Sequence, residues 1–322
     1  MSITTGPLRY IPIERVQGLS PDIFCQQYLT GSGRPVVLTD AVRSWPALSR
    51  WSFQWFKTRY GSESVSPRNW VGSVGTKFQK IMTLGDFIDY LDAPDKPSPG
   101  LWIDTATLHP SPGPTEALEH PLYLAWSIFA KHPELLEDVE LSPKFVEDWV
   151  PLFPKALRAV LDGATRYFTA GILMGSRDSQ MGVHYDFLDS HAYLAQMVGR
   201  KRCVLFSPED SAALYNGKVD VDRPDLETFP LFQHATAYEC VLEPGQLLFI
   251  PYRWWHHVVS LEKTITVNYN FFNHVNFSGY MTHLLQILPA LVDGIADSPE
   301  ERAALGIQWT CRGFDFRGSG TA

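Results

Sequence analysis

Apolar residues alternate with short groups of turn formers through the second half of the chain, as they do in antiparallel β structure. The pattern predicts strands over residues 167–174, 192–198 and 202–206. A further stretch, residues 243–251, reads as a turn followed by a buried strand. Strands alternating with turns in this way favour a double-stranded antiparallel barrel over about residues 166–273.

The first half mixes helices and strands. Ser20 can cap a helix that runs to Tyr28, and residues 35–38 have the apolar run of a strand. Helical spacing recurs over residues 53–59 and again from Thr83. These N-terminal elements are therefore predicted to be α/β in character.

Three further segments complete the pattern. Residues 92–114 are rich in Pro and turn formers, so we expect an irregular loop, and a loop that long beside a barrel is often functional. Residues 115–161 predict a helical insert interrupted by prolines. Residues 277–295 return to helical spacing, with an apolar face that packs either on the barrel or on a second subunit.

The predicted fold class is mainly β with added helices: a double-stranded β-helix core of the jelly-roll kind, N-terminal α/β elements and C-terminal helices. With 322 residues, 45% of them hydrophobic, the chain can bury a large core. Two regions are expected: an enzyme-sized domain over residues 1–274, and a C-terminal helical extension over 275–322 that could form a homodimer contact.

Charge, hydropathy and cysteine content limit the partners and the cellular compartment that we expect. A formal net charge of −8 argues against direct nucleic-acid binding, because neutralising phosphates needs basic surface. No stretch reaches the roughly 18 apolar residues of a membrane span, so no membrane contact is expected. The four cysteines are widely spaced without a Cys-x-x-Cys pair, which predicts reduced thiols and a cytoplasmic protein.

The most informative chemistry is the tripeptide His184-Tyr185-Asp186 together with His256. In extended backbone, residues i and i+2 share a face, so His184 and Asp186 can reach one metal ion. Two imidazoles and one carboxylate form the facial triad of non-haem Fe(II) enzymes, which leaves three coordination positions open. Since a single His-x-Asp can occur by chance, the surrounding strand and turn pattern matters. We predict that His184, Asp186 and His256 bind the metal and are catalytic.

Several motifs in the expected order resemble the JmjC family of Fe(II)- and 2-oxoglutarate-dependent oxygenases, within the cupin group. The resemblance includes the asparaginyl hydroxylases that act on hypoxia-inducible factor and bacterial JmjC-like hydroxylases, and it covers about residues 8–274. The motifs that carry it are His184-Tyr185-Asp186, residues 196–206, residues 250–257, residues 265–268, and the early segments at 34–39 and 45–51.

The resemblance implies a pocket for 2-oxoglutarate. Lys201 is at the position of the lysine that binds the distal carboxylate of this co-substrate, and Tyr123 matches a tyrosine whose hydroxyl assists it. Asn268 matches a pocket asparagine near the metal. Of the adjacent histidines, His256 is at the ligand position, and His257 should point the opposite way as a packed or hydrogen-bonded residue.

Three departures from the family pattern lie around the site. Met181 occupies a position that bears a hydroxyl in the relatives. The segment from residue 186 to 196 is two residues longer, so either Ser190 or His191 could replace a pocket asparagine. Asn270 stands where a tryptophan is found. These changes bear on the substrate more than on iron chemistry.

The resemblance implies a dioxygenase that uses Fe(II), 2-oxoglutarate and O2 to hydroxylate an unactivated C–H bond. The favoured substrate is an amino-acid side chain in a peptide or protein. Alternatives are hydroxylation of a small metabolite or free amino acid, and demethylation of N-methyl-lysine through the same attack on a methyl carbon. A non-enzymatic cupin-like binding module is a fourth possibility, although it would have no need of an open iron site.

Overall fold

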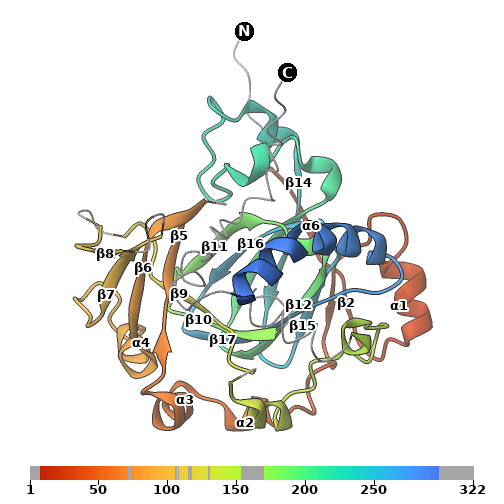
Figure 1. Cartoon of the computed structure of the whole chain (residues 1–322). Helices are drawn as coiled ribbons and strands as arrows, with labels where there is room; N and C mark the ends of the chain where they lie inside the picture. The colour runs from red at the N-terminus through yellow and green to blue at the C-terminus, as the bar shows by residue number, and fades with distance from the viewer. Residues whose placement is uncertain are drawn as a thin grey trace.

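The computed structural model describes residues 8–71, 74–105, 107, 109–114, 118–129, 131–153 and 170–296. The first residues of the predicted barrel (166–169), parts of the predicted helical insert (115–117, 130 and 154–161) and residues 297–322 lie outside the described part. Two β-sheets dominate the described chain, with helices at the periphery (Figure 1). The predicted fold class is confirmed.

The larger sheet has twelve strands. Adjacent strands follow the order β2-β3-β15-β12-β17-β10-β9-β5-β6-β7-β8, and β4 pairs with β6. Their bounds are β2 (Arg15–Val16), β3 (Val36–Leu38), β4 (Ser64–Val65), β5 (Arg68–Val71), β6 (Val74–Thr83), β7 (Leu101–Asp104), β8 (Pro110–Ser111), β9 (Tyr123–Trp126), β10 (Ala170–Gly175), β12 (His191–Val198), β15 (Leu247–Ile250) and β17 (Thr264–Phe271).

The smaller sheet has five strands in the order β1-β14-β13-β16-β11. Their bounds are β1 (Arg9–Pro12), β14 (Thr236–Leu242), β13 (Lys201–Phe206), β16 (Trp255–Ser260) and β11 (Gln180–His184). Side chains from the two sheets meet in one buried cluster, which includes Leu194 and Leu248 of the larger sheet and Cys203 and Val258 of the smaller one. The barrel interior lies between the sheets.

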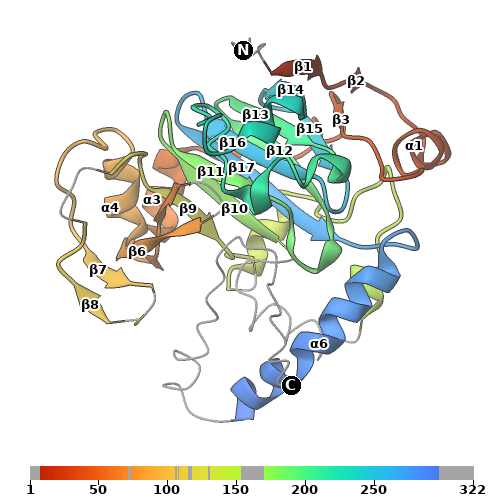
Figure 2. The same cartoon turned by 90° about the horizontal axis from the view of Figure 1, so that it is seen from above.

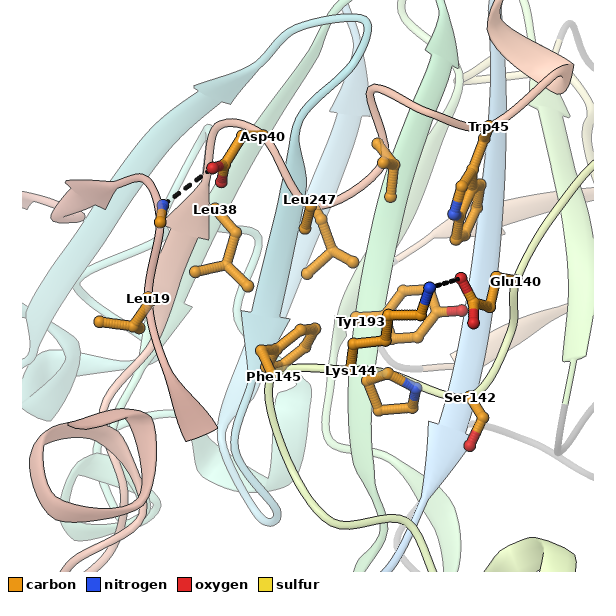
Figure 3. Close-up of a pocket in the computed structure, with 14 residues that line it drawn as sticks. Leu19, Leu38, Asp40, Trp45, Glu140, Ser142, Lys144, Phe145, Tyr193 and Leu247 are labelled. Atoms are coloured by element: carbon orange, nitrogen blue, oxygen red, sulfur yellow. Dashed lines mark hydrogen bonds and ion pairs between the residues drawn. The ribbon is translucent and has the colours of Figure 1, made fainter. Parts of the chain in front are cut away.

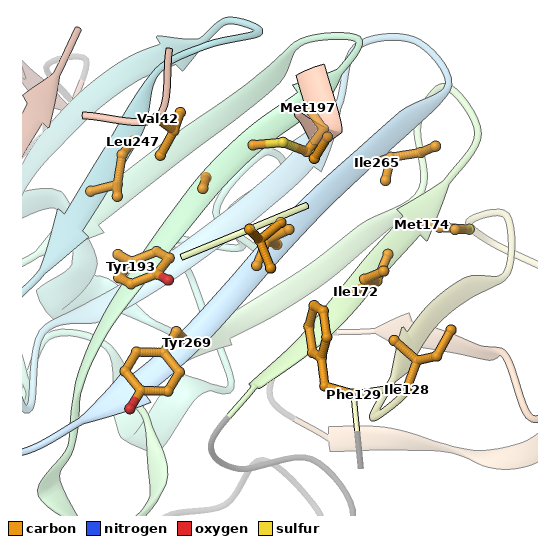
Figure 4. Packing of buried hydrophobic residues seen from close by; sticks show 14 of the residues in the cluster. Val42, Ile128, Phe129, Ile172, Met174, Tyr193, Met197, Leu247, Ile265 and Tyr269 are labelled. Carbon is orange, nitrogen blue, oxygen red and sulfur yellow. The ribbon is translucent and has the colours of Figure 1, made fainter. Parts of the chain in front are cut away.

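The outer face of the larger sheet carries a second, larger core. Alternate residues of β12 and β17, such as Tyr193, Met197, Ile265 and Tyr269, point to this face (Figure 4). Because side chains alternate along a strand, the residues between them point into the barrel. This alternation separates the structural core from the interior, where polar chemistry can be placed.

Helices cover this outer core. The α-helices are α1 (Pro21–Tyr28), α2 (Ala47–Arg50), α3 (Phe53–Tyr60), α4 (Leu84–Tyr90) and α6 (Phe277–Ala296). Short 3-10 helices are η1 (Pro133–Glu137), η2 (Val150–Leu152), η3 (Phe187–Asp189), η4 (Pro208–Asp210), η5 (Tyr215–Gly217) and η6 (Pro230–His234). The Ser20 side chain accepts from the Ile23 amide, as predicted, and Thr83, where a helix was expected to begin, caps α4 in the same way.

The predicted helical insert at residues 115–161 is wrong in its described part. Residues Tyr123–Trp126 form strand β9, which pairs with β10 in the barrel wall, and only the two short 3-10 helices η1 and η2 occur. A four-residue strand has no period long enough to be read from sequence, and its pairing with β10 depends on residues about fifty positions away.

The stretch at residues 92–114 is also more regular than expected. Its described part contributes β7 and β8, which extend the larger sheet beyond β6. These strands lie on the opposite side of the molecule from α1 (Figures 1 and 2). The stretch therefore widens the sheet at one edge. Of the helices in the described part of the chain, none combines the length and the apolar character of a bilayer-crossing segment.

Candidate metal centre

A β-bulge in β11 sets the direction of the first predicted ligand. Met181 pairs with Val258, and His184 pairs with His256, so three steps along β11 match two steps along β16. The extra residue reverses the alternation of side chains from that point on. Met181 lies against the barrel interior, Val183 packs in the cluster outside the smaller sheet, and His184 is returned to the interior opposite His256.

The three predicted ligands come together. Ligand atoms of His184, Asp186 and His256 all lie within 4.8 Å of one another, and no other such group of His, Cys, Asp or Glu occurs among the residues that the structure describes. Nε2 of His256 is 3.9 Å from Oδ1 of Asp186. Strand β11 ends at His184, but Asp186 keeps extended torsions (φ −71°, ψ 149°), which supports the same-face argument.

Hydrogen bonds fix which nitrogen each imidazole presents. Nδ1 of His184 donates to the carbonyl oxygen of Gly182 at 2.8 Å, and Nδ1 of His256 donates to that of Trp254 at 3.1 Å. A protonated Nδ1 leaves the Nε2 lone pair free in a neutral imidazole. Both histidines are thereby held in the form that binds a metal ion through Nε2.

Burial disfavours the charged forms of His184 and Asp186 when no cation is bound. It lowers the pKa of His184 well below its usual value, and the neighbouring His256 lowers it further. Burial also raises the pKa of Asp186, while His256 and a hydrogen bond from Asn270 act in the opposite direction. The donor set and its burial fit a divalent cation, which would replace the water that these groups have lost.

Polar residues of β17 and of the turn before β12 support the carboxylate. Asn270 hydrogen-bonds Asp186, and its Nδ2 donates to Oγ of Ser190 at 3.1 Å. Of the two candidates for the missing pocket asparagine, Ser190 therefore lies beside the site. His191 instead faces the outer core against Phe249 and Phe271, and its Nδ1 accepts from the Tyr252 amide.

Lys201 and Tyr123 meet inside the barrel from opposite sheets. Nζ of Lys201 donates to the Tyr123 hydroxyl at 2.6 Å, and Lys201 is fully buried. Burial lowers the pKa of Lys201 to about 7 and raises that of Tyr123. Gly175, paired with Tyr123, permits this contact, because a Cβ there would lie 2.8 Å from the tyrosine ring.

Lys201 has no carboxylate partner among the described residues, which is unusual for a fully buried cation. Because the Tyr123 oxygen accepts from Lys201, the tyrosine O–H remains free to donate elsewhere. The two groups together present a positive charge and a second donor to the interior. Such a pair is suited to an anionic ligand.

Asn268 also points into the barrel. Its Nδ2 lies 3.4 Å from Oδ1 of Asn270, and a Cβ on Gly171 would stand 3.0 Å from its Oδ1. Because Gly171 has no side chain, the side-chain amide of Asn268 has room beside it. Asn268 is thus placed beside the residue that contacts Asp186.

His257 points away from the metal centre, as predicted. Its Nε2 lies 3.0 Å from Oδ2 of Asp222, on the outer side of the smaller sheet. Asp222 also pairs with Arg202, and contact with His257 is the main reason that the pKa of Asp222 is lowered. His234 and His274 are exposed and lie outside the centre.

A separate cavity of about 200 Å3 lies on the outer face of the larger sheet (Figure 3). Tyr193 and Leu247 form part of its apolar wall. At its rim, Lys144 pairs with Glu140 at 2.8 Å, and Asp40 accepts from the amide of Gly18 at 2.8 Å. It contains none of the predicted site residues.

A family comparison agrees with this geometry. Residues 21–277 match the model of the cupin-like domain, so the chain belongs to the cupin-like domain family. Its relatives place it within the JmjC type, whose members are 2-oxoglutarate-dependent oxygenases that use Fe(II). The predicted resemblance is confirmed.

Curated relatives carry several different names. Lysine-specific demethylase 8 of Danio rerio is 30% identical over 283 residues, covering 82% of this chain and 59% of the relative. The tRNA wybutosine-synthesizing protein 5 of Danio rerio is 37% identical over 153 residues, covering 46% and 41%. Arginine-specific demethylase JMJ20 of Arabidopsis thaliana is 26% identical over 291 residues, covering 83% and 58%. The chain spans less than two thirds of each of these relatives.

Proposed function

We propose that the chain is an Fe(II)- and 2-oxoglutarate-dependent dioxygenase that hydroxylates a C–H bond of an amino-acid side chain in a peptide or protein. The observation that carries the proposal is the joint presence, in one barrel, of the triad and of a buried lysine that has no anionic partner among the described residues. A pure binding module has no need of either.

The triad would hold the iron through Nε2 of His184, Nε2 of His256 and a carboxylate oxygen of Asp186. Ferrous iron and 2-oxoglutarate together supply the oxidative chemistry, in which O2 is consumed, a C–H bond becomes C–OH, and succinate and carbon dioxide are released. The chain's own work is to fix the ligand geometry. The carbonyl oxygens of Gly182 and Trp254 orient the imidazoles, and Asn270 orients the carboxylate.

Lys201 and Tyr123 would bind the distal carboxylate of 2-oxoglutarate. The Lys201 ammonium neutralises it, and the free O–H of Tyr123 donates to it. Asn268 would contact the co-substrate nearer the metal, given its position beside Asn270. Met181 supplies no hydroxyl here, so the lysine and tyrosine would carry most of the polar contact.

A polypeptide substrate is supported by the placement of the proline-rich stretch. Strands β7 and β8 extend the larger sheet at one edge, so the described part of this stretch does not fold over the barrel as a lid. The length of the resemblance to a lysine-specific demethylase, 82% of this chain, points to protein substrates as well and keeps N-methyl-lysine demethylation as an alternative.

A tRNA substrate is the second candidate, because relatives named for tRNA wybutosine synthesis are 32–37% identical over about half of this chain. The net charge of −8 weighs against it, since a polyanion needs basic surface for binding. Hydroxylation of a free amino acid or small metabolite is a third candidate. A cytoplasmic location remains our prediction.

The decisive experiment is anaerobic reconstitution with Fe(II) and 2-oxoglutarate, followed by exposure to O2 with peptide, methyl-lysine peptide, tRNA and amino-acid pools in separate reactions. Mass spectrometry should find one added oxygen on a side-chain carbon of a peptide, together with succinate. Asp186→Ala is the control and should give neither product. Turnover of tRNA or of a free amino acid in preference to every peptide would replace the proposed substrate class. Wild-type activity of Asp186→Ala would refute the proposed triad.

A further inference from the structure

An ion pair joins the two chain segments that carry the predicted ligands. Nε and Nη2 of Arg253 donate to Oδ2 of Asp189 at 2.9 and 2.6 Å. Asp189 follows Asp186 by three residues, and Arg253 precedes His256 by three. The pair therefore closes a short loop of structure around the metal centre, with one ligand on each arm.

The backbone at both ends of this pair is held in a conformation that side chains disfavour. Leu188, Asp189 and Arg253 have φ values of 59°, 52° and 62°. For residues with a Cβ, the left-handed region is crowded and is retained only where the surroundings impose it. The strain thus falls on the segments that lead directly to Asp186 and His256.

Helix α6 and the residue before it contact Asp189 from the other side. Asn276 donates to the backbone oxygen of Asp189 at 2.8 Å, and Gly279 packs so closely that a Cβ there would lie 2.7 Å from Oδ2 of Asp189. Nδ1 of His283 lies 3.7 Å from the same oxygen. The side chain of Asp189 is 4% exposed, so Arg253 is the partner that neutralises its buried charge.

From this arrangement we infer that Asp189 and Arg253 are positioning residues, which set the separation of Asp186 from His256 and couple helix α6 to the metal centre. The inference rests on the proposed function, because it assigns the pair a role toward the metal. Neither residue is itself a ligand. They act through the backbone turns at η3 and at the loop before β16.

Cobalt(II) binding to the purified chain tests the inference without requiring turnover. Arg253→Met is compared with Arg200→Met, a matched control. Arg200 pairs with Glu262 at 2.7 Å and has a side-chain exposure of 51%, against 54% for Arg253, but it lies away from the centre. We expect Arg253→Met to weaken cobalt binding by about 10- to 100-fold and to shift the d–d absorption spectrum, while Arg200→Met matches the wild type. Cobalt binding by Arg253→Met as tight as by Arg200→Met would overturn the inference.

Two more variants separate positioning from a loss of folding. Gly279→Ala favours helix formation but pushes on Oδ2 of Asp189, so we expect weaker cobalt binding, whereas its exposed neighbour Ser278→Ala should behave as wild type. Arg253→Lys keeps the charge and should bind cobalt with intermediate affinity. If Arg253→Met lowers the thermal midpoint of the metal-free protein more than Arg200→Met does, these variants decide the question. Wild-type cobalt affinity in both would refute the coupling.

Failure of the proposed function would look different. A wild-type chain that binds cobalt but consumes no 2-oxoglutarate with Fe(II) would refute the dioxygenase proposal and leave the positioning role intact. Conversely, an active enzyme in which Arg253→Met and Gly279→Ala bind metal normally would refute the positioning role alone.

Discussion

Nζ of Lys201 lies 2.6 Å from the hydroxyl oxygen of Tyr123, although 78 positions separate the two residues and they come from opposite sheets. Tyr123 is on β9 and Lys201 begins β13, so their contact spans the barrel interior. The lysine has only a neutral partner there among the described residues. Three of the predictions below follow from this contact.

Replacing the lysine should impair co-substrate binding before anything else. In Lys201→Met, the distal carboxylate of 2-oxoglutarate would be buried without a cation, at a cost of about 2–5 kcal/mol. The dissociation constant for 2-oxoglutarate should therefore rise more than about tenfold, as measured by calorimetry on the manganese-loaded protein. Cobalt affinity serves as the control and should be unchanged. Unaltered 2-oxoglutarate binding would mean that another cation does this work.

Co-substrate affinity should fall as the pH rises above about 7. Burial lowers the pKa of Lys201 to about 7, so the free protein loses its ammonium above that pH. A bound carboxylate favours the charged lysine and raises its pKa, so affinity is full below about pH 7 and decreases by up to tenfold per pH unit above it. Titrations from about pH 6 to about pH 9 would measure this. A flat profile in the wild type would contradict the assignment, and Lys201→Met should lack this decrease.

Removing the tyrosine hydroxyl should have a smaller effect in the same assay. Tyr123→Phe leaves the buried ammonium without its hydrogen-bond acceptor and the carboxylate without a donor, a loss of about 1–3 kcal/mol. The pH at which 2-oxoglutarate affinity begins to fall should also move below that of the wild type, because an unpartnered buried lysine is deprotonated more easily. If Tyr123→Phe binds 2-oxoglutarate as well as the wild type at every pH, the tyrosine has no part in the pocket.

The adjacent histidines should separate cleanly by metal content. His256→Ala removes a ligand and should abolish stoichiometric cobalt binding, whereas His257→Ala breaks only the contact with Asp222 on the far side of β16. We expect His257→Ala to lose some thermal stability and to retain the metal. Metal analysis of both purified variants tests this, and equal loss of metal in the two would reverse or withdraw the choice of His256.

The parts of the fold that sequence predicted well depend on local signals. Ser20 and Thr83 cap their helices through interactions within one turn, and β12 and β13 are short, mostly apolar runs that are buried along nearly their whole length. Strand β9 was missed, because its four residues are held by pairing with β10 rather than by any local preference. The match of Tyr123 to the family motif does not depend on this strand, so the sequence predicts its role without predicting β9.

The candidate site also has parts that local sequence signals predict and parts that depend on long-range pairing. The triad could be found from residue types and spacing, since extended backbone places positions i and i+2 together. Asn270 could be identified only as a departure from the family pattern, and its contacts with Ser190 and Asp186 depend on the register of β17 beside β12. The ion pair of Asp189 with Arg253 had no sequence signal, because 64 positions separate the residues.

Because of the bulge in β11, Met181 and His184 both face the barrel interior although they are three positions apart. In a regular strand these four residues would turn the imidazole toward the outside of the barrel, whereas deleting Gly182 would remove the extra residue and keep His184 directed into the barrel opposite His256. When this chain is aligned with other barrels, the placement of a single gap near Gly182 therefore decides whether a histidine in the aligned column faces a metal or the solvent side.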